Sequence, residues 1–190
     1  MATERFMTGL IGRNIARSRS PAMHEAEADS QGLRLIYSLF DFAALDYSEH
    51  DLPRLLSALQ LAGFSGVNVT HPYKQTIIES LDALSDEAAS IGAVNTVAFT
   101  EGRRIGHNTD VTGFAAAFRE SLDGVGLSDV VQIGAGGAGS ATAFALLSLG
   151  AARLTVFDSD FAKATALCRK LSARYDTAAV SAGSDIEGAV

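Results

Sequence analysis

The sequence predicts an α/β protein, on the basis of three observations. Short apolar runs alternate with amphipathic segments along the chain, a pattern typical of mostly parallel sheets covered by helices. An apolar run at residues 129–133 leads into a glycine-rich turn and then into an apolar helix-like segment. The 190 residues are 47% hydrophobic and 19% charged, enough for one or two packed domains. We place the domain boundary so that residues 1–109 and 110–190 form the two domains.

Eight elements are expected in the first domain. Ser20 as N-cap, Pro21 in the first turn and Gly32 just past the end predict its first helix. Leucines at helical spacing predict the second helix, and Glu101-Gly102 is typical of a hairpin turn. The expected strands are Phe6–Ile11, Leu35–Phe42, Val67–Val69, Val94–Phe99 and Arg104–His107, and the expected helices are Pro21–Gln31, Asp51–Ala62 and Ser80–Ile91.

Strands and helices are predicted to alternate regularly in the second domain, after a turn-rich break at residues 123–126. An amphipathic helix precedes the break, and the start of a third strand comes last. The expected elements are Asp110–Leu122, Asp129–Ile133, Gly137–Leu149, Arg153–Phe157, Asp160–Arg174 and the strand opening at Ala178–Val180.

Bulk properties exclude several classes of protein. The net charge is −7 and no lysine or arginine block occurs, which argues against a nucleic-acid partner. Cys168 is the single cysteine, so no internal disulfide is possible. The four histidines lack ligand spacing, so no metal site is expected. Without a signal-peptide pattern or a membrane-spanning apolar run, a cytoplasmic protein that does not bind a membrane is the expectation.

The glycine-rich turn predicts a dinucleotide site. It follows a GxGxxG pattern between a strand and a helix, which is the informative context for this motif. Gly134 permits the tight turn, Gly136 lets a pyrophosphate approach the main chain, and Gly139 lets helix and strand pack closely. The acidic residue expected about 20 positions further on is Asp158. The candidate cofactor-binding residues are Gly134, Ala135, Gly136, Gly137, Ala138, Gly139 and Asp158.

The second domain is thus a Rossmann-type dinucleotide-binding domain, of which the sequence contains only the first mononucleotide-binding half. We therefore expect a C-terminally incomplete chain, with weak cofactor binding and little turnover.

Polar residues gather at predicted strand ends in the first domain. Ser18 and Ser20 can donate to an anion near the start of a helix, although Ser20 could equally only cap that helix. Asn68 and Thr70 point to the same side, because side chains alternate along a strand. Taken singly, Lys74 is typical of a solvated surface group, and Asn95 and Asp110 are typical of turns or N-caps.

Together these segments resemble the shikimate/quinate dehydrogenase family. The matching runs are Ser18-Arg19-Ser20-Pro21 with His24, Asn68-Val69-Thr70-His71-Pro72-Tyr73-Lys74, Gly92-Ala93-Val94-Asn95-Thr96, Asn108-Thr109-Asp110 and the glycine turn. The resemblance implies that the first domain is a substrate-binding and catalytic domain. It implies that Ser18, Ser20 and Thr70 hold a carboxylate, that Asn68, Asn95 and Asp110 hold ring hydroxyls, and that Lys74 and Asp110 form the catalytic pair.

The family resemblance implies NAD(P)-dependent interconversion of shikimate and 3-dehydroshikimate, a reaction of aromatic amino acid biosynthesis. At the end of the second cofactor strand, NADP-preferring members of the family share a stretch that reads Asn-Arg-Thr or Asn-Arg-Ser. This chain has Asp158-Ser159-Asp160 at that position, so the resemblance favours NAD. Glu25, after His24, resembles the NAD-using quinate/shikimate subgroup. Quinate as main substrate, or a non-catalytic ligand-binding regulator, are the alternatives. The protein is expected to be a monomer or a homodimer.

Overall fold

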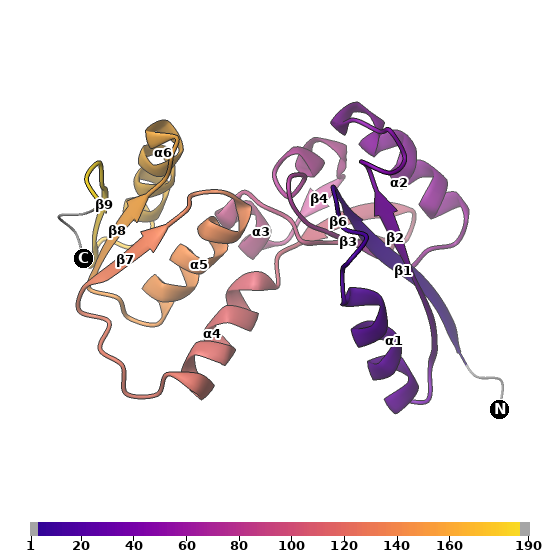
Figure 1. Cartoon of the computed structure of the whole chain (residues 1–190), viewed down its shortest axis with the longest axis horizontal. Helices are drawn as coiled ribbons and strands as arrows, with labels where there is room; N and C mark the ends of the chain where they lie inside the picture. Colours follow the sequence, from indigo (N-terminus) through magenta and orange to yellow (C-terminus); the bar gives the residue numbers. More distant parts are fainter. Residues whose placement is uncertain (1–3, 187–190) are drawn as a thin grey trace. The chain divides into compact units, whose positions relative to one another are not determined.

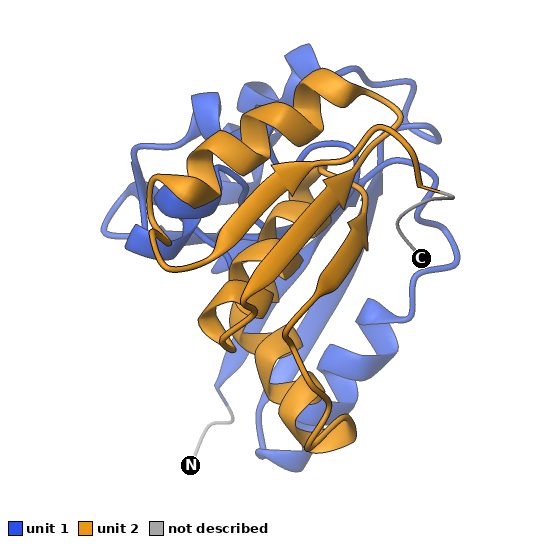
Figure 2. Ribbon diagram, turned by 90° about the vertical axis from the view of Figure 1, so that its left-hand side faces the viewer, with its two compact units in different colours: residues 1–108 blue, residues 109–190 orange. Residues whose placement is uncertain are grey.

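A computed structural model describes residues 4–186, and the chain divides into two compact units, residues 1–108 (unit 1) and residues 109–190 (unit 2). Figure 1 traces the elements along the sequence, and Figure 2 colours the two units. Each unit contains its own sheet and its own helices, so the predicted α/β class is confirmed. No helix in the described part of the chain combines the length and the apolar character needed to cross a bilayer.

Unit 1 is built on a six-stranded sheet in the order β2-β1-β3-β5-β6-β4. The first three strands in this order are parallel, whereas β5 runs antiparallel to both β3 and β6. The expectation of a mostly parallel sheet is confirmed for unit 1: β6 runs with β3, β4 pairs in parallel with β6, and β5 alone among the described strands of this sheet runs in the opposite direction. The strands are β1 (Arg5–Gly12), β2 (Arg34–Asp41), β3 (Gly66–Val69), β4 (Ala83–Leu84), β5 (Thr96–Thr100) and β6 (Arg103–His107).

The helices of unit 1 are α1 (Ser20–Ser30), α2 (Leu52–Leu61) and α3 (Asp86–Ile91), with short 3-10 helices at Glu49–Asp51 and Thr76–Ser80.

One helix prediction, Ser80–Ile91, is wrong over its first half. The main chain there pairs with β6 instead: Asp82 N–H donates to the Arg104 carbonyl at 2.9 Å, and Ser85 N–H donates to the Gly106 carbonyl at 2.8 Å. The Ser85 side chain then accepts from Ala88 N–H and starts α3. Long-range strand pairing overrides the local helical pattern here.

Ser20 is not the N-cap of α1. It is the first helical residue, the cap position is Arg19, and no side chain caps this end. The Ser20 side chain is engaged by Ser18 instead, which accounts for the difference.

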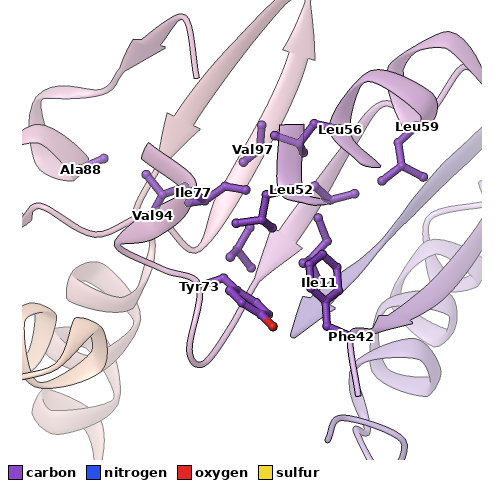
Figure 3. Close-up of a cluster of buried hydrophobic side chains, with 12 residues drawn as sticks. Ile11, Phe42, Leu52, Leu56, Leu59, Tyr73, Ile77, Ala88, Val94 and Val97 are labelled. Atoms are coloured by element: carbon purple, nitrogen blue, oxygen red, sulfur yellow. The ribbon is translucent and has the colours of Figure 1, made fainter. Parts of the chain in front are cut away.

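A cluster of buried side chains forms the core of unit 1 (Figure 3). Ile11 from β1, Phe42 after β2 and Leu56 from α2 are fully buried in it. Burial of each such side chain contributes about 2 kcal/mol. Tyr73 and Ile77 belong to the same cluster and are 3% and 0% exposed. They anchor the loop that carries Lys74 on both of its sides.

Unit 2 is a three-stranded parallel sheet in the order β7-β8-β9, as its strand–helix alternation predicts. Helices α5 and α6 each bury one set of apolar residues, and α4 packs against α5. The elements are α4 (Asp110–Ser121), β7 (Val130–Ile133), α5 (Gly137–Ser148), β8 (Arg153–Phe157), α6 (Phe161–Ser172) and β9 (Ala179–Ala182).

Candidate active site

The loop between β1 and α1 is held by a buried carboxylate that sequence reasoning missed. Asp41 ends β2 and is 8% exposed. Its two oxygens accept from Asn14 N–H and Ile15 N–H, each at 2.8 Å, and one also accepts from Ala43 N–H at 3.0 Å. Burial alone would raise the pKa of Asp41, but these backbone donors, with Ala44, hold it below its ordinary value. The ionised carboxylate thus fixes the turn that leads to Ser18.

The two candidate serines lie together at the start of α1. Ser18 Oγ donates to Ser20 Oγ at 3.1 Å, and Ser20 N–H donates back to Ser18 Oγ at 3.2 Å. The Ser20 side chain also lowers the pKa of Tyr37 in β2, although burial raises that pKa more. Tyr37 was not among the predicted site residues, and it lies in the middle of a strand with no motif around it.

The two candidate asparagines are connected in the same way. The Tyr37 hydroxyl donates to Asn68 Oδ1 at 2.7 Å, and Asn68 Nδ2 donates to Thr96 Oγ1 at 3.1 Å. Thr96 Oγ1 donates in turn to Asn95 Oδ1 at 3.0 Å. The structure therefore joins Asn68 to Asn95 through Thr96, and Tyr37 binds the same Asn68 amide; the prediction left out both Tyr37 and Thr96. Thr96 stands next to Asn95 in one of the family motifs, which was a sequence signal for it. No motif contains Tyr37.

Thr70 and Lys74 bound the loop after β3. Thr70 N–H donates to the Ile11 carbonyl at 2.9 Å, and the Lys74 carbonyl accepts from Val94 N–H at 2.7 Å. This second bond ties the Lys74 main chain to the residue before Asn95. Both side chains are half-buried. Asp110, the other predicted catalytic residue, is the first residue of α4 and belongs to unit 2.

The glycine turn has the geometry expected for a phosphate site. Gly134 has φ +107°, a conformation that L side chains rarely adopt. A Cβ atom at Gly139 would collide with the Gly134 carbonyl group, whereas one at Gly136 would meet open space. The N-terminus of α5 therefore has main-chain N–H groups beside an unobstructed approach, which suits an anion.

Gln132, in β7, braces this turn and was not predicted. Its Nε2 donates to the Gly134 carbonyl and to the Gly139 carbonyl, each at 2.8 Å. Its Oε1 is buried and has no hydrogen-bond partner among residues 4–186. The amide must point this way, because an oxygen facing two carbonyls would be repelled.

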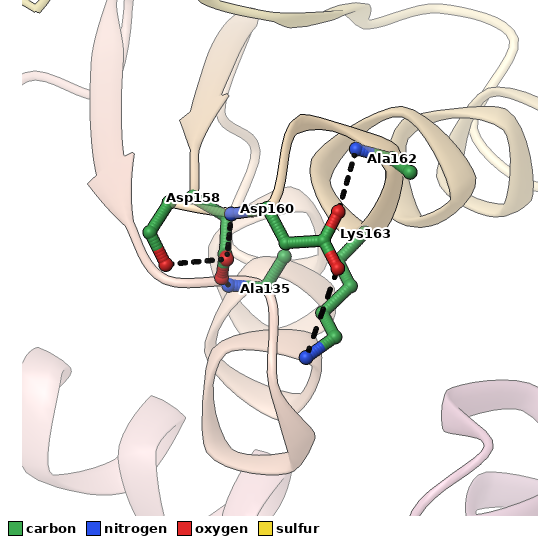
Figure 4. Close-up of polar contacts among 6 residues, drawn as sticks. Ala135, Asp158, Asp160, Ala162 and Lys163 are labelled. Carbon is green, nitrogen blue, oxygen red and sulfur yellow. Dashed lines mark hydrogen bonds and ion pairs between the residues drawn. The ribbon is translucent and has the colours of Figure 1, made fainter.

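Asp158 follows β8 and is bound to the same turn (Figure 4). One oxygen accepts from Ala135 N–H at 2.7 Å, and the other accepts from Asp160 N–H at 2.9 Å. The Asp160 and Ala135 donors hold the pKa of Asp158 below its ordinary value. Asp160 caps α6 through Ala162 N–H at 3.1 Å, as expected. Asp158, however, is not left free by that cap, because it ties β8 to the glycine turn.

A lysine of α6 lies beside this pair of carboxylates. The Lys163 ammonium is 4.0 Å from the Asp160 carboxylate, and its charge contributes to the lowered pKa of Asp158. Figure 4 shows the Lys163 side chain extending from α6 to the Asp160 carboxylate. Arg153 pairs elsewhere, with Asp129 at 3.1 Å.

A cavity of about 420 Å³ opens at the carboxyl ends of the three strands of unit 2. Open α/β sheets bind ligands at this edge. Asp158 borders the cavity, so its carboxylate lies where hydroxyl groups of a ligand could reach it. The lining residues are Ile133, Phe157, Asp158, Ser159, Phe161, Gly183, Ser184 and Ile186. Among the described residues, no group of three histidine, cysteine or acidic side chains could hold a metal ion.

The fold and the glycine turn define an α/β protein with a Rossmann-type dinucleotide-binding unit. Residues 10–97 match the family described as the shikimate dehydrogenase substrate binding domain. The chain is 47% identical over 184 residues to the shikimate dehydrogenase (NADP(+)) of Streptomyces avermitilis, covering 97% of this chain and 63% of that protein. It is 44% identical over 189 residues to the quinate/shikimate dehydrogenase (NAD(+)) of Corynebacterium efficiens, covering 99% and 66%. The chain belongs to the shikimate/quinate dehydrogenase family.

A solved structure supports the same family. The quinate dehydrogenase from Corynebacterium glutamicum in complex with NAD is 42% identical, with a TM-score of 0.86. The match covers 95% of this chain and 64% of that one. The chain therefore spans slightly less than two thirds of the length of these relatives.

Proposed function

We propose that the chain supplies the substrate-binding and cofactor-binding residues of an NAD(P)-dependent shikimate dehydrogenase, which interconverts shikimate and 3-dehydroshikimate by hydride transfer. The observation that carries this proposal is a pair of hydrogen-bonded groups of polar side chains in unit 1. One joins Ser18 to Ser20, and the other joins Asn68 to Asn95 through Thr96. Such groups suit a small ligand that has a carboxylate and several ring hydroxyls. The names of the relatives support the same substrate class.

In this proposal, Ser18, Ser20 and Thr70 hold the substrate carboxylate. Asn68, Asn95 and Asp110 hold ring hydroxyls, which matches their amide and carboxylate chemistry. A backbone cradle at Gly134–Gly139 holds the pyrophosphate of the cofactor, and Asp158 accepts from the adenosine ribose hydroxyls. When bound, the nicotinamide cofactor accepts the hydride of the substrate alcohol.

Lys74 and Asp110 handle the proton of the reacting hydroxyl. Oxidation of an alcohol requires that a proton leaves as the hydride departs, and a lysine facing a carboxylate can relay this proton and stabilise the developing alkoxide. Lys74 is half-buried, and its carbonyl accepts from Val94 N–H, which holds its main chain beside the segment that leads to Asn95.

Substitution of the catalytic pair tests the proposal. In a protein extended to the full length of the relatives, we expect Lys74→Ala or Asp110→Asn to lower kcat/KM by about 10²–10⁴-fold, the usual range for acid–base groups. Reduction of NAD and NADP with shikimate is followed by absorbance. Lys170→Ala and Asp123→Asn, which change exposed residues of the same types, are the matched controls. Near-normal turnover in both Lys74 and Asp110 variants would overturn the assignment.

We further propose that NAD is favoured over NADP. The Asp158 carboxylate is held in place at the strand end, where it would meet the 2′-phosphate of NADP as a like charge. Lys163 offsets this repulsion in part, so we expect a preference rather than an exclusion.

The ratio of kcat/KM for the two cofactors measures this preference. Asp158→Asn should shift the ratio toward NADP, and Lys163→Ala should shift it toward NAD, whereas the exposed control Asp176→Asn should leave it unchanged. A wild type that prefers NADP, or an Asp158→Asn variant with an unchanged ratio, contradicts the proposal.

Quinate as main substrate is the second candidate, because relatives from Corynebacterium are named quinate or quinate/shikimate dehydrogenases. The second hydroxyl position of the Ser18-Arg19-Ser20 run is a serine and not a threonine, which slightly favours shikimate as the substrate. Parallel assays with quinate and shikimate separate the two candidates. Binding of either ligand without turnover would instead support a non-catalytic regulator.

A further inference from the structure

We propose that Tyr37 and Thr96 are positioning residues, which fix the donor and acceptor directions of the candidate substrate site through one continuous hydrogen-bond chain. The chain runs Tyr37, Asn68, Thr96, Asn95. Its existence depends only on the contacts of unit 1, whereas the identity of its ligand rests on the function proposed above.

The direction of the chain follows from the chemistry of the amide at its centre. Asn68 Oδ1 can only accept and Nδ2 can only donate. The Tyr37 hydroxyl, 2.7 Å from Oδ1, must therefore donate its single proton there. Thr96 Oγ1, 3.1 Å from Nδ2, must accept, so its own proton is directed to Asn95 Oδ1.

The two ends of the chain follow from the same reasoning. The Tyr37 proton is committed to Asn68, so Tyr37 is the donor at one end. At the other end, Asn95 accepts the Thr96 proton through Oδ1. Ser18 and Ser20 form a separate pair, in which Ser18 Oγ donates to Ser20 Oγ.

Helix α1 holds Tyr37 rigidly enough to play this part. The ring is 5% exposed and stacks on His24, with centroids 4.8 Å apart and planes inclined by 7°. Strand β2 is an edge strand of the sheet, and the backbone N–H of Tyr37 donates there to Glu25 Oε1 of α1 at 2.9 Å. Burial raises the pKa of Tyr37 to about 12, although the Ser20 side chain lowers it. The phenol therefore remains a donor at physiological pH.

Sheet topology places Thr96 beside its partner. Asn68 and Thr96 are directly opposite each other in the antiparallel pairing of β3 with β5. Cross-strand neighbours of this kind are close enough for their side chains to interact. Tyr37, by contrast, lies two strands away from Asn68 and reaches it across β1. Two residues without a predicted role therefore link three separate segments of the site.

The chain itself can be tested without a substrate. Side-chain amide signals of Asn68 and Asn95 are recorded by nuclear magnetic resonance in Tyr37→Phe and in Thr96→Val. We expect the Asn95 signals to shift in both variants, because hydrogen bonds in a chain polarise one another. The control is Tyr175→Phe, which removes a hydroxyl bonded to Ser148 Oγ at 2.8 Å in unit 2. Unchanged Asn95 signals in Tyr37→Phe and Thr96→Val would overturn the proposal.

Ligand binding tests the positioning role. Tyr37→Phe should raise KM for shikimate about tenfold, the effect of about one hydrogen bond, and should leave kcat nearly unchanged. In an Asn68→Ala background the same substitution should have no further effect on KM, because Tyr37 acts through Asn68.

Two results distinguish failure of this inference from failure of the proposed function. Equal, additive effects of Tyr37→Phe in both backgrounds indicate a merely structural tyrosine and overturn the positioning role. The second result is a wild type that neither binds nor oxidises shikimate or quinate, while the Asn95 amide signals still shift in the Tyr37→Phe and Thr96→Val variants. This result supports the hydrogen-bond chain and overturns the proposed function.

Discussion

The two units hold their candidate ligand-binding groups in different ways. In unit 1, side chains from β2, β3 and β5 orient one another, and Asn68 depends on partners that are distant in sequence. In unit 2, main-chain N–H groups of one local turn face the approach to α5, braced by Gln132 and Asp158. A site of the first kind is sensitive to the loss of one hydroxyl. A site of the second kind is sensitive to an added atom at a glycine.

The largest expected effect is in the glycine turn. Gly139→Ala places a Cβ atom against the Gly134 carbonyl, where main chain must move to admit it. We expect the free energy of unfolding to fall by about 3 kcal/mol, as in an overpacked core, and cofactor binding to be lost. Denaturant unfolding and NAD titration measure both effects.

Gly113→Ala is the matched control, because a Cβ atom there in α4 meets open space. Alanine is the better helix former, so this variant should gain up to about 1 kcal/mol. Equal stability of the two alanine variants would show that the turn is not tightly packed.

A smaller effect is expected from the charge of Asp158. Asp158→Asn should lower the free energy of unfolding by about 1.5 kcal/mol at neutral pH, since backbone donors favour the ionised carboxylate. The folded-state pKa is depressed, so this stability is present above the ordinary aspartate pKa and is lost as pH falls through the folded-state value. The difference between wild type and variant should therefore shrink in acid. A difference that is constant with pH would contradict this explanation, and Asp176→Asn should show no difference.

The smallest effect at neutral pH is expected from Tyr37. Tyr37→Phe should cost about 1 kcal/mol, the net value of one hydrogen bond. The folded-state pKa is raised to about 12 from 10.0, so the wild type loses stability as pH rises through this window and the phenylalanine variant does not. Unfolding curves at increasing pH should converge. A gap that widens above pH 10 would contradict the burial of this phenol.

The sequence predicted unit 2 more accurately than unit 1. Strand β8 lies at the predicted Arg153–Phe157, and the other elements of unit 2 differ from their predicted bounds by a few residues at most. The apolar runs and the glycine turn there act locally, so a short window of sequence contains the information. In unit 1 the residues around Ala83 pair with β6 rather than continue a helix, and no local pattern could predict that pairing.

By itself, the sequence determined the glycine turn, the Asp160 cap of α6 and the family motifs, because each depends on a few adjacent residues and on the conformations they allow. Only the tertiary structure decided which side chains meet. Tyr37 reaches Asn68 because the strand order β2-β1-β3 places one strand between them, and Thr96 meets Asn68 because of the β3–β5 register. Hydrogen bonds require a few ångströms and a direction, which spacing along the chain does not specify.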